Sequence, residues 1–221
     1  MHKTIENLNY IQNQINSKIL KLNISNYKPK IIAISKTFPM NKILPLINHG
    51  HKHFGENKVQ ESIEKWTSIK NDFTDIKLHL VGKLQTNKVK YVIPLFDYIH
   101  SLDNRKLAEK ISNEQDKKKI KPKIFIQINI GNETQKSGIE IENLENFYNL
   151  CTKELNLNII GLMCLPPNEE NPTLYFSKMQ ELSNMIQTKD LSMGMSNDYV
   201  EAIKFKSTFL RIGSKIFGPR D

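Results

Sequence analysis

The chain has 221 residues, of which 38% are hydrophobic and 25% charged, and a formal net charge of +9. This length predicts one domain over residues 1–221, because single (β/α)₈ barrels begin at roughly 200 residues. The lysines are scattered except for the run at 115–123, which lacks interleaved aromatics and is expected to be a solvated loop. The composition therefore argues against a nucleic-acid-binding module. No apolar stretch approaches the length of a membrane span, so we expect no membrane association.

An amphipathic helix is predicted first, over residues 5–22. Its apolar residues recur at three- and four-residue steps; they are Ile5, Leu8, Ile11, Ile15, Ile19 and Leu22. Short apolar runs rich in β-branched residues then predict eight strands; they cover 30–35, 51–55, 76–82, 98–102, 123–130, 158–165, 190–194 and 209–213. Helical stretches separate them, as in repeated βα units. The fold class expected is α/β, a single (β/α)₈ TIM barrel with an extra N-terminal helix.

Lys36 directly follows the first predicted strand. In such barrels the functional residues sit at the C-terminal ends of strands. Lys36 shares a face with Ile34 and Ile32, where an ammonium loses solvation and a neutral amine is favoured. Such an amine can attack an aldehyde. The alternative is a lysine whose ammonium simply reaches the solvent at the rim.

The last two predicted strands end in residues suited to bind an anion. Ser196 begins a Ser-Asn-Asp segment of helix-capping types, and Gly213 precedes Ser214 at the end of the eighth strand. Loops after strands seven and eight are the usual phosphate site of this fold. Two ordinary glycine-containing turns are the alternative.

Arg211 lies two residues before Gly213 and is therefore expected on the same face of the strand, toward the mouth of the barrel. A pyridoxal cofactor needs a partner at its ring nitrogen, and an arginine keeps that nitrogen neutral. This makes the ring a weaker electron sink. Alternatively, Arg211 pairs with a neighbouring carboxylate.

Several segments resemble the pyridoxal phosphate homeostasis proteins, and the resemblance spans nearly the whole chain. The matching blocks are ISKTF at Lys36, LSMGMSND, RIGSKIFG, HFGENKVQE (53–61), HLVGKLQTNKVK (79–90), IHSLD (99–103), INIGNETQKSGI (128–139) and GLMCLPP (161–167). The resemblance implies a barrel of the alanine racemase N-terminal type. It also implies that pyridoxal 5′-phosphate is the cofactor, carried in homeostasis and passed to apo-enzymes without amino-acid turnover.

The resemblance also assigns roles to individual residues. It places the imine on Lys36 and the phosphate near Ser196, Gly213 and Ser214. Arg211 matches the ring-nitrogen partner, Asn57 a residue beside the cofactor ring, and Lys136 a second lysine that handles the cofactor. Phe38 and Lys58 depart from the family, in which lysine and tyrosine are common at these positions. The first departure argues against a secondary transfer role for position 38.

The main rival is a racemase or decarboxylase of the same fold type. Racemisation needs a second acid–base group opposite the lysine, which a second domain supplies in the racemases that this chain resembles. The chain ends at Asp221, just after the eighth strand, so we expect no such segment and a monomer. His49, His51 and His53 alternate as metal ligands can, but no third ligand at suitable spacing is evident. His79 and His100 are expected to be packed or hydrogen-bonded residues near the mouth.

The two lone cysteines and the N-terminus, which lacks a continuous apolar segment, bear on the location of the protein in the cell. Cys151 and Cys164 have neither metal-site spacing nor the density of a disulfide scaffold. We therefore expect a cytoplasmic protein without a signal peptide.

Overall fold

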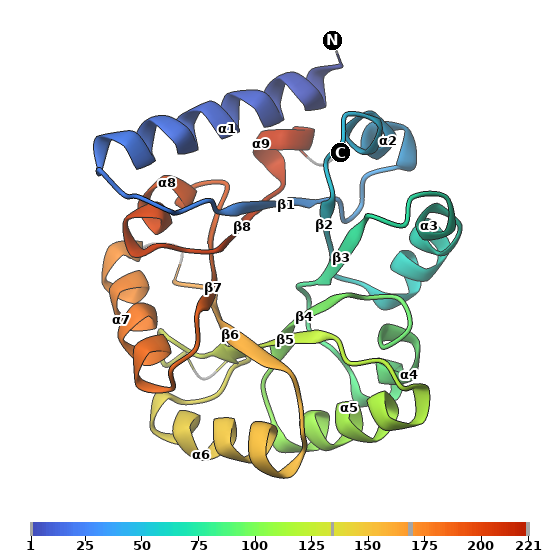
Figure 1. Cartoon of the computed structure of the whole chain (residues 1–221), viewed down its shortest axis with the longest axis vertical. Helices are drawn as coiled ribbons and strands as arrows, with labels where there is room; N and C mark the ends of the chain where they lie inside the picture. Colours follow the sequence, from blue (N-terminus) through green and yellow to red (C-terminus); the bar gives the residue numbers. More distant parts are fainter. Residues whose placement is uncertain (1, 134, 168–169, 220–221) are drawn as a thin grey trace.

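The computed structural model describes residues 2–133, 135–167 and 170–219. Eight parallel strands pair in chain order, and the last pairs with the first, so the sheet closes into a barrel (Figure 1). The strands are β1 (Lys30–Ile34), β2 (His53–Glu56), β3 (Lys77–Leu80), β4 (Tyr98–Leu102), β5 (Lys123–Ile128), β6 (Ile159–Cys164), β7 (Asp190–Met195) and β8 (Phe209–Ile212). The predicted (β/α)₈ barrel is confirmed.

Helices connect and surround the strands (Figure 1). They are α1 (Lys3–Lys21), α2 (Met40–Asn48), α3 (Val59–Asp72), α4 (Val89–Val92), α5 (Arg105–Lys118), α6 (Leu144–Asn149), α7 (Pro172–Met185), α8 (Tyr199–Ala202) and α9 (Ser214–Phe217), with 3₁₀ turns η1 (Thr86–Lys88), η2 (Ile141–Asn143) and η4 (Ile203–Phe205) and a π-helical turn η3 (Leu150–Glu154). Local chemistry fixes several starts. Asn104 caps α5 by accepting from the N–H of Leu107 at 2.9 Å, and Pro172 opens α7 behind its cap Asn171.

The extra N-terminal helix is also confirmed as α1. It lies outside the barrel alongside α8, α9 and α2 (Figure 1). Leu8, Ile11 and Ile15 are buried on its inner face, as the sequence periodicity predicts. The side-chain amide of Asn7 donates to the carbonyl of Ile216 at 2.9 Å. This contact ties α1 to the chain that follows β8.

The lysine-rich run at 115–123 differs from its prediction as a loop. The helix α5 continues to Lys118, and Lys119 ends it in a left-handed conformation with φ of 55°. Gln115 is buried and donates to the carbonyl of Asn156 at 3.1 Å, which anchors this last turn. The lysines themselves are exposed, so the run is solvated but partly helical.

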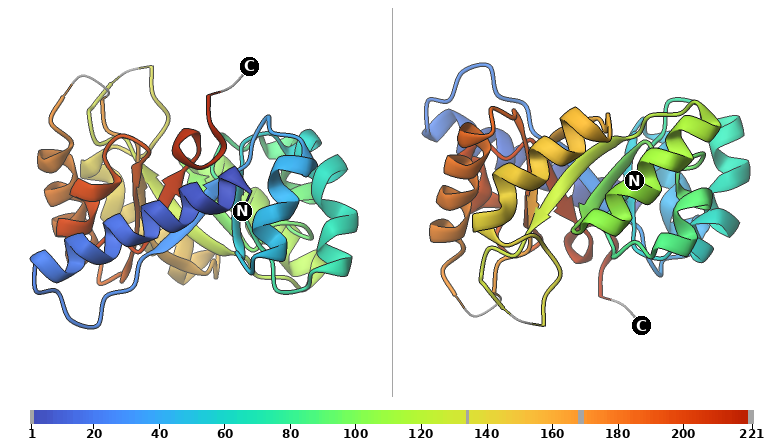
Figure 2. Two further views of the ribbon diagram at one scale, coloured as in Figure 1. Left: turned by 90° about the horizontal axis from the view of Figure 1, so that it is seen from above. Right: turned by 90° about the horizontal axis from the view of Figure 1, so that it is seen from below.

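Apolar side chains fill two layers, because each strand is covered on both faces. The larger cluster joins the outward faces of the strands to the helices. A smaller cluster contains Ile32, Ile34, Tyr98, Phe125, Met163 and Phe209. It belongs to the barrel interior, and its member Ile34 also lines the candidate site. Figure 2 shows α9 at the same end of the barrel as the loops after β5 and β6.

None of the helices in the described part of the chain combines the length and hydropathy needed to cross a bilayer.

Candidate functional site

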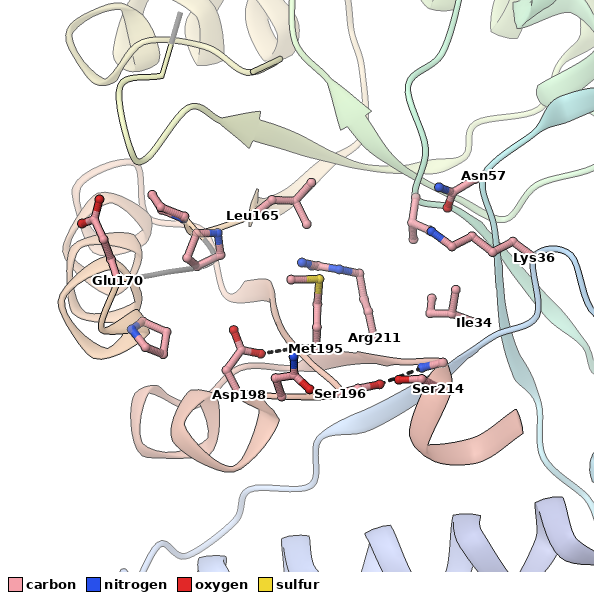
Figure 3. A pocket seen from close by; sticks show the side chains of 16 residues that line it. Ile34, Lys36, Asn57, Leu165, Glu170, Met195, Ser196, Asp198, Arg211 and Ser214 are labelled. Carbon is pink, nitrogen blue, oxygen red and sulfur yellow. Dashed lines mark hydrogen bonds between the residues drawn. The ribbon is translucent and has the colours of Figure 1, made fainter. Parts of the chain in front are cut away.

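A cavity of about 750 Å³ opens where the strands end, between the segments that follow β1, β2, β3, β6, β7 and β8 (Figure 3). This volume is in the range of small-molecule sites, roughly 300 to 1,000 Å³. All of the residues predicted to bind the cofactor line this cavity; they are Lys36, Asn57, Ser196, Arg211, Gly213 and Ser214. The structure thus brings the predicted set together, whereas its role in binding stays a prediction.

Lys36 is half-buried, and its side chain extends into the cavity (Figure 3). It lies in a turn that Lys65 of α3 holds on both sides. The Lys65 ammonium donates to the carbonyl of Ser35 at 3.0 Å and to Glu61 Oε1 at 2.8 Å, and the same oxygen accepts from the N–H of Thr37 at 2.7 Å. Thr37 has φ of 67°, which is strained for a β-branched residue. These contacts hold the turn in a conformation that it would otherwise avoid.

A buried carboxylate completes the support of this turn. Glu56, at the end of β2, is fully buried. Its Oε1 accepts from Ser35 Oγ at 2.7 Å, Trp66 Nε1 at 3.0 Å and Lys65 Nζ at 3.1 Å. All three donors of the Lys65 ammonium are therefore used on the Lys36 turn and its two supporting carboxylates.

We expect Glu61→Ala to destabilise the apo-protein by about 1–3 kcal/mol, because it leaves a largely buried ammonium with one acceptor fewer and the N–H of Thr37 without its partner. Urea unfolding, followed by the fluorescence of Trp66, measures the difference. Glu64→Ala is the matched control, since Glu64 is exposed on the same helix and, among the described residues, bonds only Gln60. An equal loss in both variants would contradict the role assigned to Glu61.

The effect of Glu61→Ala should also depend on pH. Burial alone would raise the pKa of Glu61, but hydrogen bonds from Lys65 and Thr37 outweigh it and hold the pKa below its ordinary value. A carboxyl with a depressed pKa in the folded state stabilises the fold above the unfolded pKa. This stabilisation is lost as the pH falls through the folded value. The difference between wild type and Glu61→Ala should therefore shrink in acid.

Arg211 is buried in the floor of the cavity and is held by oxygen atoms of two neighbouring strands. Its Nη1 donates to Ser192 Oγ at 2.6 Å and to the Ser192 carbonyl, and Nη2 donates to the carbonyl of Cys164 at 2.7 Å. Burial lowers the pKa of Arg211, which Cys164 and Asp198 partly oppose. Arginine nevertheless stays a cation in proteins. Within the described residues it forms no salt bridge, so the alternative of a paired structural arginine is not what the structure shows.

The ends of β7 and β8 meet at the lower edge of the cavity (Figure 3). Ser196 Oγ accepts from the N–H of Gly213 at 3.3 Å, so the two residues predicted to share a ligand are adjacent. A Cβ atom at Gly213 would lie 3.3 Å from Cβ of Ile34, which is tight for any side chain. The N-cap residue of α8 is Asp198, the last residue of the predicted capping segment, but its side chain forms no capping hydrogen bond. The helix α8 begins after Asp198 and has a single turn, and the carboxylate of Asp198 accepts from the N–H of Met195.

Asn57 lies beside Lys36 on the cavity wall (Figure 3). Its Oδ1 is buried and has no hydrogen-bond partner within residues 2–133, 135–167 and 170–219. A buried orphan acceptor is costly and indicates a ligand group that would satisfy it. Gly82 allows the backbone of Asn57 to lie this close, because a Cβ atom at position 82 would lie 2.4 Å from the Asn57 carbonyl oxygen.

The two positions that depart from the family lie away from the cavity. Phe38 is buried and stacks on Phe217 with ring centroids 4.9 Å apart, so this residue belongs to the core. Lys58 is exposed at the start of α3. Lys136 forms an ion pair with Glu133 and does not line the cavity. None of these three side chains lines the cavity that contains Lys36.

The residues that support the site were not predicted from the sequence. Glu61 and Lys65 were visible as an i, i+4 pair on a predicted helix, a spacing that favours ion pairing. Ser192 and the cavity wall formed by Leu165, Pro166 and Pro167 gave no comparable signal. Their roles follow from contacts between strands.

The expectation for His79 and His100, that they are packed or hydrogen-bonded residues near the mouth, is met in part. His79 and His100 are fully buried and hydrogen-bonded to each other, but they lie inside the barrel rather than at its mouth. In the described part of the chain, no group of three His, Cys, Asp or Glu residues is arranged to hold a metal. Both cysteines are buried and free, and burial raises the pKa of each thiol to about 12.

The barrel with its lysine-bearing cavity belongs to a known class of protein: residues 9–221 match the family described as alanine racemase, N-terminal domain. The pyridoxal phosphate homeostasis protein of Aquifex aeolicus is 40% identical over 86% of this chain and 87% of its own. That of Haemophilus influenzae is 36% identical over 97% of this chain and 95% of its own. The chain therefore belongs to the pyridoxal phosphate homeostasis proteins.

A solved structure supports the same assignment. PipY of Synechococcus elongatus PCC7942, solved with PLP bound, is 30% identical and superimposes with a TM-score of 0.79. The match covers 92% of this chain and 100% of PipY. The family resemblance and the fold expected from the sequence are confirmed.

Proposed function

We propose that this chain binds pyridoxal 5′-phosphate in the cavity, holds it as a Schiff base on Lys36, and releases it to apo-enzymes. The observation that carries the proposal is the convergence of Lys36, Arg211 and the Ser196–Gly213 edge on one cavity. The choice of cofactor is supported by the two related pyridoxal phosphate homeostasis proteins and by the PLP-bound PipY structure.

The residues of the cavity fit this cofactor group by group. The Lys36 amine would condense with the aldehyde and release one water. Ser196 and the backbone at Gly213 and Ser214 would donate hydrogen bonds to the phosphate. Arg211 would face the ring nitrogen as a fixed cation. When bound, the cofactor supplies an electron sink, which an arginine partner weakens.

Absorbance spectroscopy tests binding directly. Purified apo-protein titrated with pyridoxal 5′-phosphate should develop the yellow band of a Schiff base, and the band should saturate at one cofactor per chain. Dialysis against an apo-form of a pyridoxal-phosphate enzyme should then restore the activity of that enzyme while the band fades. A colourless protein at saturating cofactor would overturn the proposal.

We also propose that the loaded protein does not turn over amino acids. Among the described residues that line the cavity, the ionisable groups are Lys36, Glu170, Asp198 and Arg211. Asp198 accepts from the N–H of Met195, and Glu170 accepts from Tyr175, so both carboxylates are engaged in the local structure. Neither is offered as a second acid–base group facing Lys36.

Incubation of the loaded protein with L-alanine is therefore expected to give no more D-alanine than the same concentration of free cofactor. Chiral chromatography measures both enantiomers. Lys36→Ala is the control for adventitious catalysis. Product in excess of the protein concentration that disappears in this variant would support the rival racemase or decarboxylase. The monomeric state and cytoplasmic location stay predictions, and light scattering after size exclusion tests the first.

A further inference from the structure

Three histidines form a hydrogen-bonded column inside the barrel, one each from β2, β3 and β4. His53 Nδ1 lies 2.9 Å from His79 Nε2, and His79 Nδ1 lies 2.9 Å from His100 Nε2. His100 Nδ1 is in turn 2.9 Å from Ser192 Oγ, which accepts from Arg211. The column therefore runs without a break from the partly exposed His53 to the guanidinium under the cavity.

Aromatic side chains fix the rings of the column. His79 stacks on Tyr98 with centroids 4.2 Å apart and planes within 10°. His100 stacks on Phe125 at 4.4 Å and 18°. The ring of Phe209 meets His100 nearly edge-on, at 84°. Because close packing leaves these rings little freedom, the hydrogen bonds are built into the core.

The imidazoles of the column are neutral near pH 7. Burial holds the pKa of His79 and of His100 well below the ordinary value, and the charge of Arg211 lowers that of His100 further. Burial and the nearby Lys30 lower the pKa of His53 to about 4. A neutral imidazole has one N–H donor and one bare acceptor nitrogen. Each ring is therefore in one of two tautomers, and the tautomer decides in which direction the ring donates along the column.

The donors and acceptors select one direction. Arg211 can only donate, so Ser192 Oγ accepts from it and directs its own proton to His100 Nδ1. His100 then carries its proton on Nε2 and donates to His79, which donates to His53 in the same way. In the reverse direction Ser192 would accept twice, and its buried hydroxyl proton would have no acceptor among the residues that the structure describes. Such an orphan donor costs about 1–3 kcal/mol.

We propose that His100 and His79 are positioning residues that act through Ser192 to hold the Arg211 guanidinium in place, aimed at the cavity. Each ring turns its acceptor nitrogen, the negative end of its dipole, toward the guanidinium. Since Arg211 has no carboxylate partner among the described residues, these aligned dipoles take the place of a counter-ion. The consequence for a cofactor rests on the proposed function: a fixed cation beside the ring nitrogen keeps that nitrogen unprotonated.

The apo-protein tests the column without any cofactor. In ¹⁵N-histidine NMR spectra of the full chain, His79 and His100 should both be neutral with the proton on Nε2 between about pH 6 and pH 8. Single histidine substitutions assign the signals of the six histidines. A proton on Nδ1 of either ring, or an imidazolium in this pH range, would overturn the proposed direction.

Variants test the action on Arg211. His100→Phe removes the acceptor of the Ser192 hydroxyl, and we expect about tenfold weaker pyridoxal 5′-phosphate binding and a shifted absorbance band. His100→Asn keeps an oxygen near the Nδ1 position and should restore most of both. His49→Gln, at an exposed position, is the control and should match wild type.

The outcomes separate this inference from the proposed function. Unchanged affinity and an unchanged band in His100→Phe would refute the positioning role, even with a normal Schiff base on Lys36. If wild type forms no Schiff base, the proposed function fails, while the NMR result still decides the direction of the column. If His100→Phe does not fold, comparing His100→Asn with His100→Gln, which places its polar group near Nε2, gives the same decision.

Discussion

Replacing Lys36 by alanine is expected to abolish the covalent attachment of pyridoxal 5′-phosphate. Borohydride reduces a Schiff base to a stable secondary amine, so peptide mapping of the reduced wild type should place the label on Lys36. The physical reason is the position of this amine, which extends into the cavity from a turn clamped by Lys65 and Glu61. The expected loss in the variant is complete, because the label requires the Lys36 nitrogen.

Two other lysines provide matched controls for this experiment. Lys136→Ala should keep the label, because Lys136 lies outside the cavity and is paired with Glu133. Lys58→Ala should also keep it, since Lys58 is exposed at the start of α3. Recovery of the label mainly on Lys136 in the wild type would overturn the assignment of the Schiff base to Lys36.

The barrel itself could be predicted from the sequence because each strand is covered on both faces. Such strands read as short apolar runs, and glycine or polar residues interrupt them where the chain turns. The ends of the strands were less predictable. The run 76–82 extends past β3, which ends at Leu80, because the chain bends near Gly82 to pass Asn57 closely. The prediction of a loop at the lysine-rich run was wrong for another reason. Gln115 is anchored to Asn156, a contact that the local sequence does not reveal.

The candidate site could be predicted in part. Lys36 and Arg211 lie at or near the C-terminal ends of strands. In a parallel barrel all of these ends lie at the same mouth, so such residues come together there. The histidine column was not predictable, because each of its hydrogen bonds joins side chains of different strands. In the sheet, His79 is paired with Gly55 on one side and with Tyr98 on the other, so its ring reaches His53 and His100 diagonally. Such contacts depend on register, which periodicity alone does not give.

The phosphate should contribute a large share of the cofactor's affinity. Pyridoxal, which has the aldehyde but no phosphate, is expected to bind on the order of 10² to 10⁴ times more weakly. Two hydrogen bonds to a charged group at about 1.5–3 kcal/mol each amount to roughly 3–6 kcal/mol, and each factor of ten corresponds to about 1.4 kcal/mol. Three residues at the ends of β7 and β8 are available to supply these two hydrogen bonds; they are Ser196, Gly213 and Ser214.

The edge formed by Ser196 and Gly213 also makes this prediction testable by mutation. In the structure the hydroxyl of Ser196 accepts from the N–H of Gly213, so a phosphate that takes this N–H replaces one hydrogen bond by a charge-assisted one. Ser196→Ala should therefore weaken the binding of pyridoxal 5′-phosphate but leave that of pyridoxal nearly unchanged, which narrows the ratio between the two ligands. Titrating both into apo-protein, with Lys36→Ala to remove the covalent step, separates the phosphate contribution from Schiff-base formation. Equal affinities of the two ligands for wild type would show that this edge does not bind the phosphate.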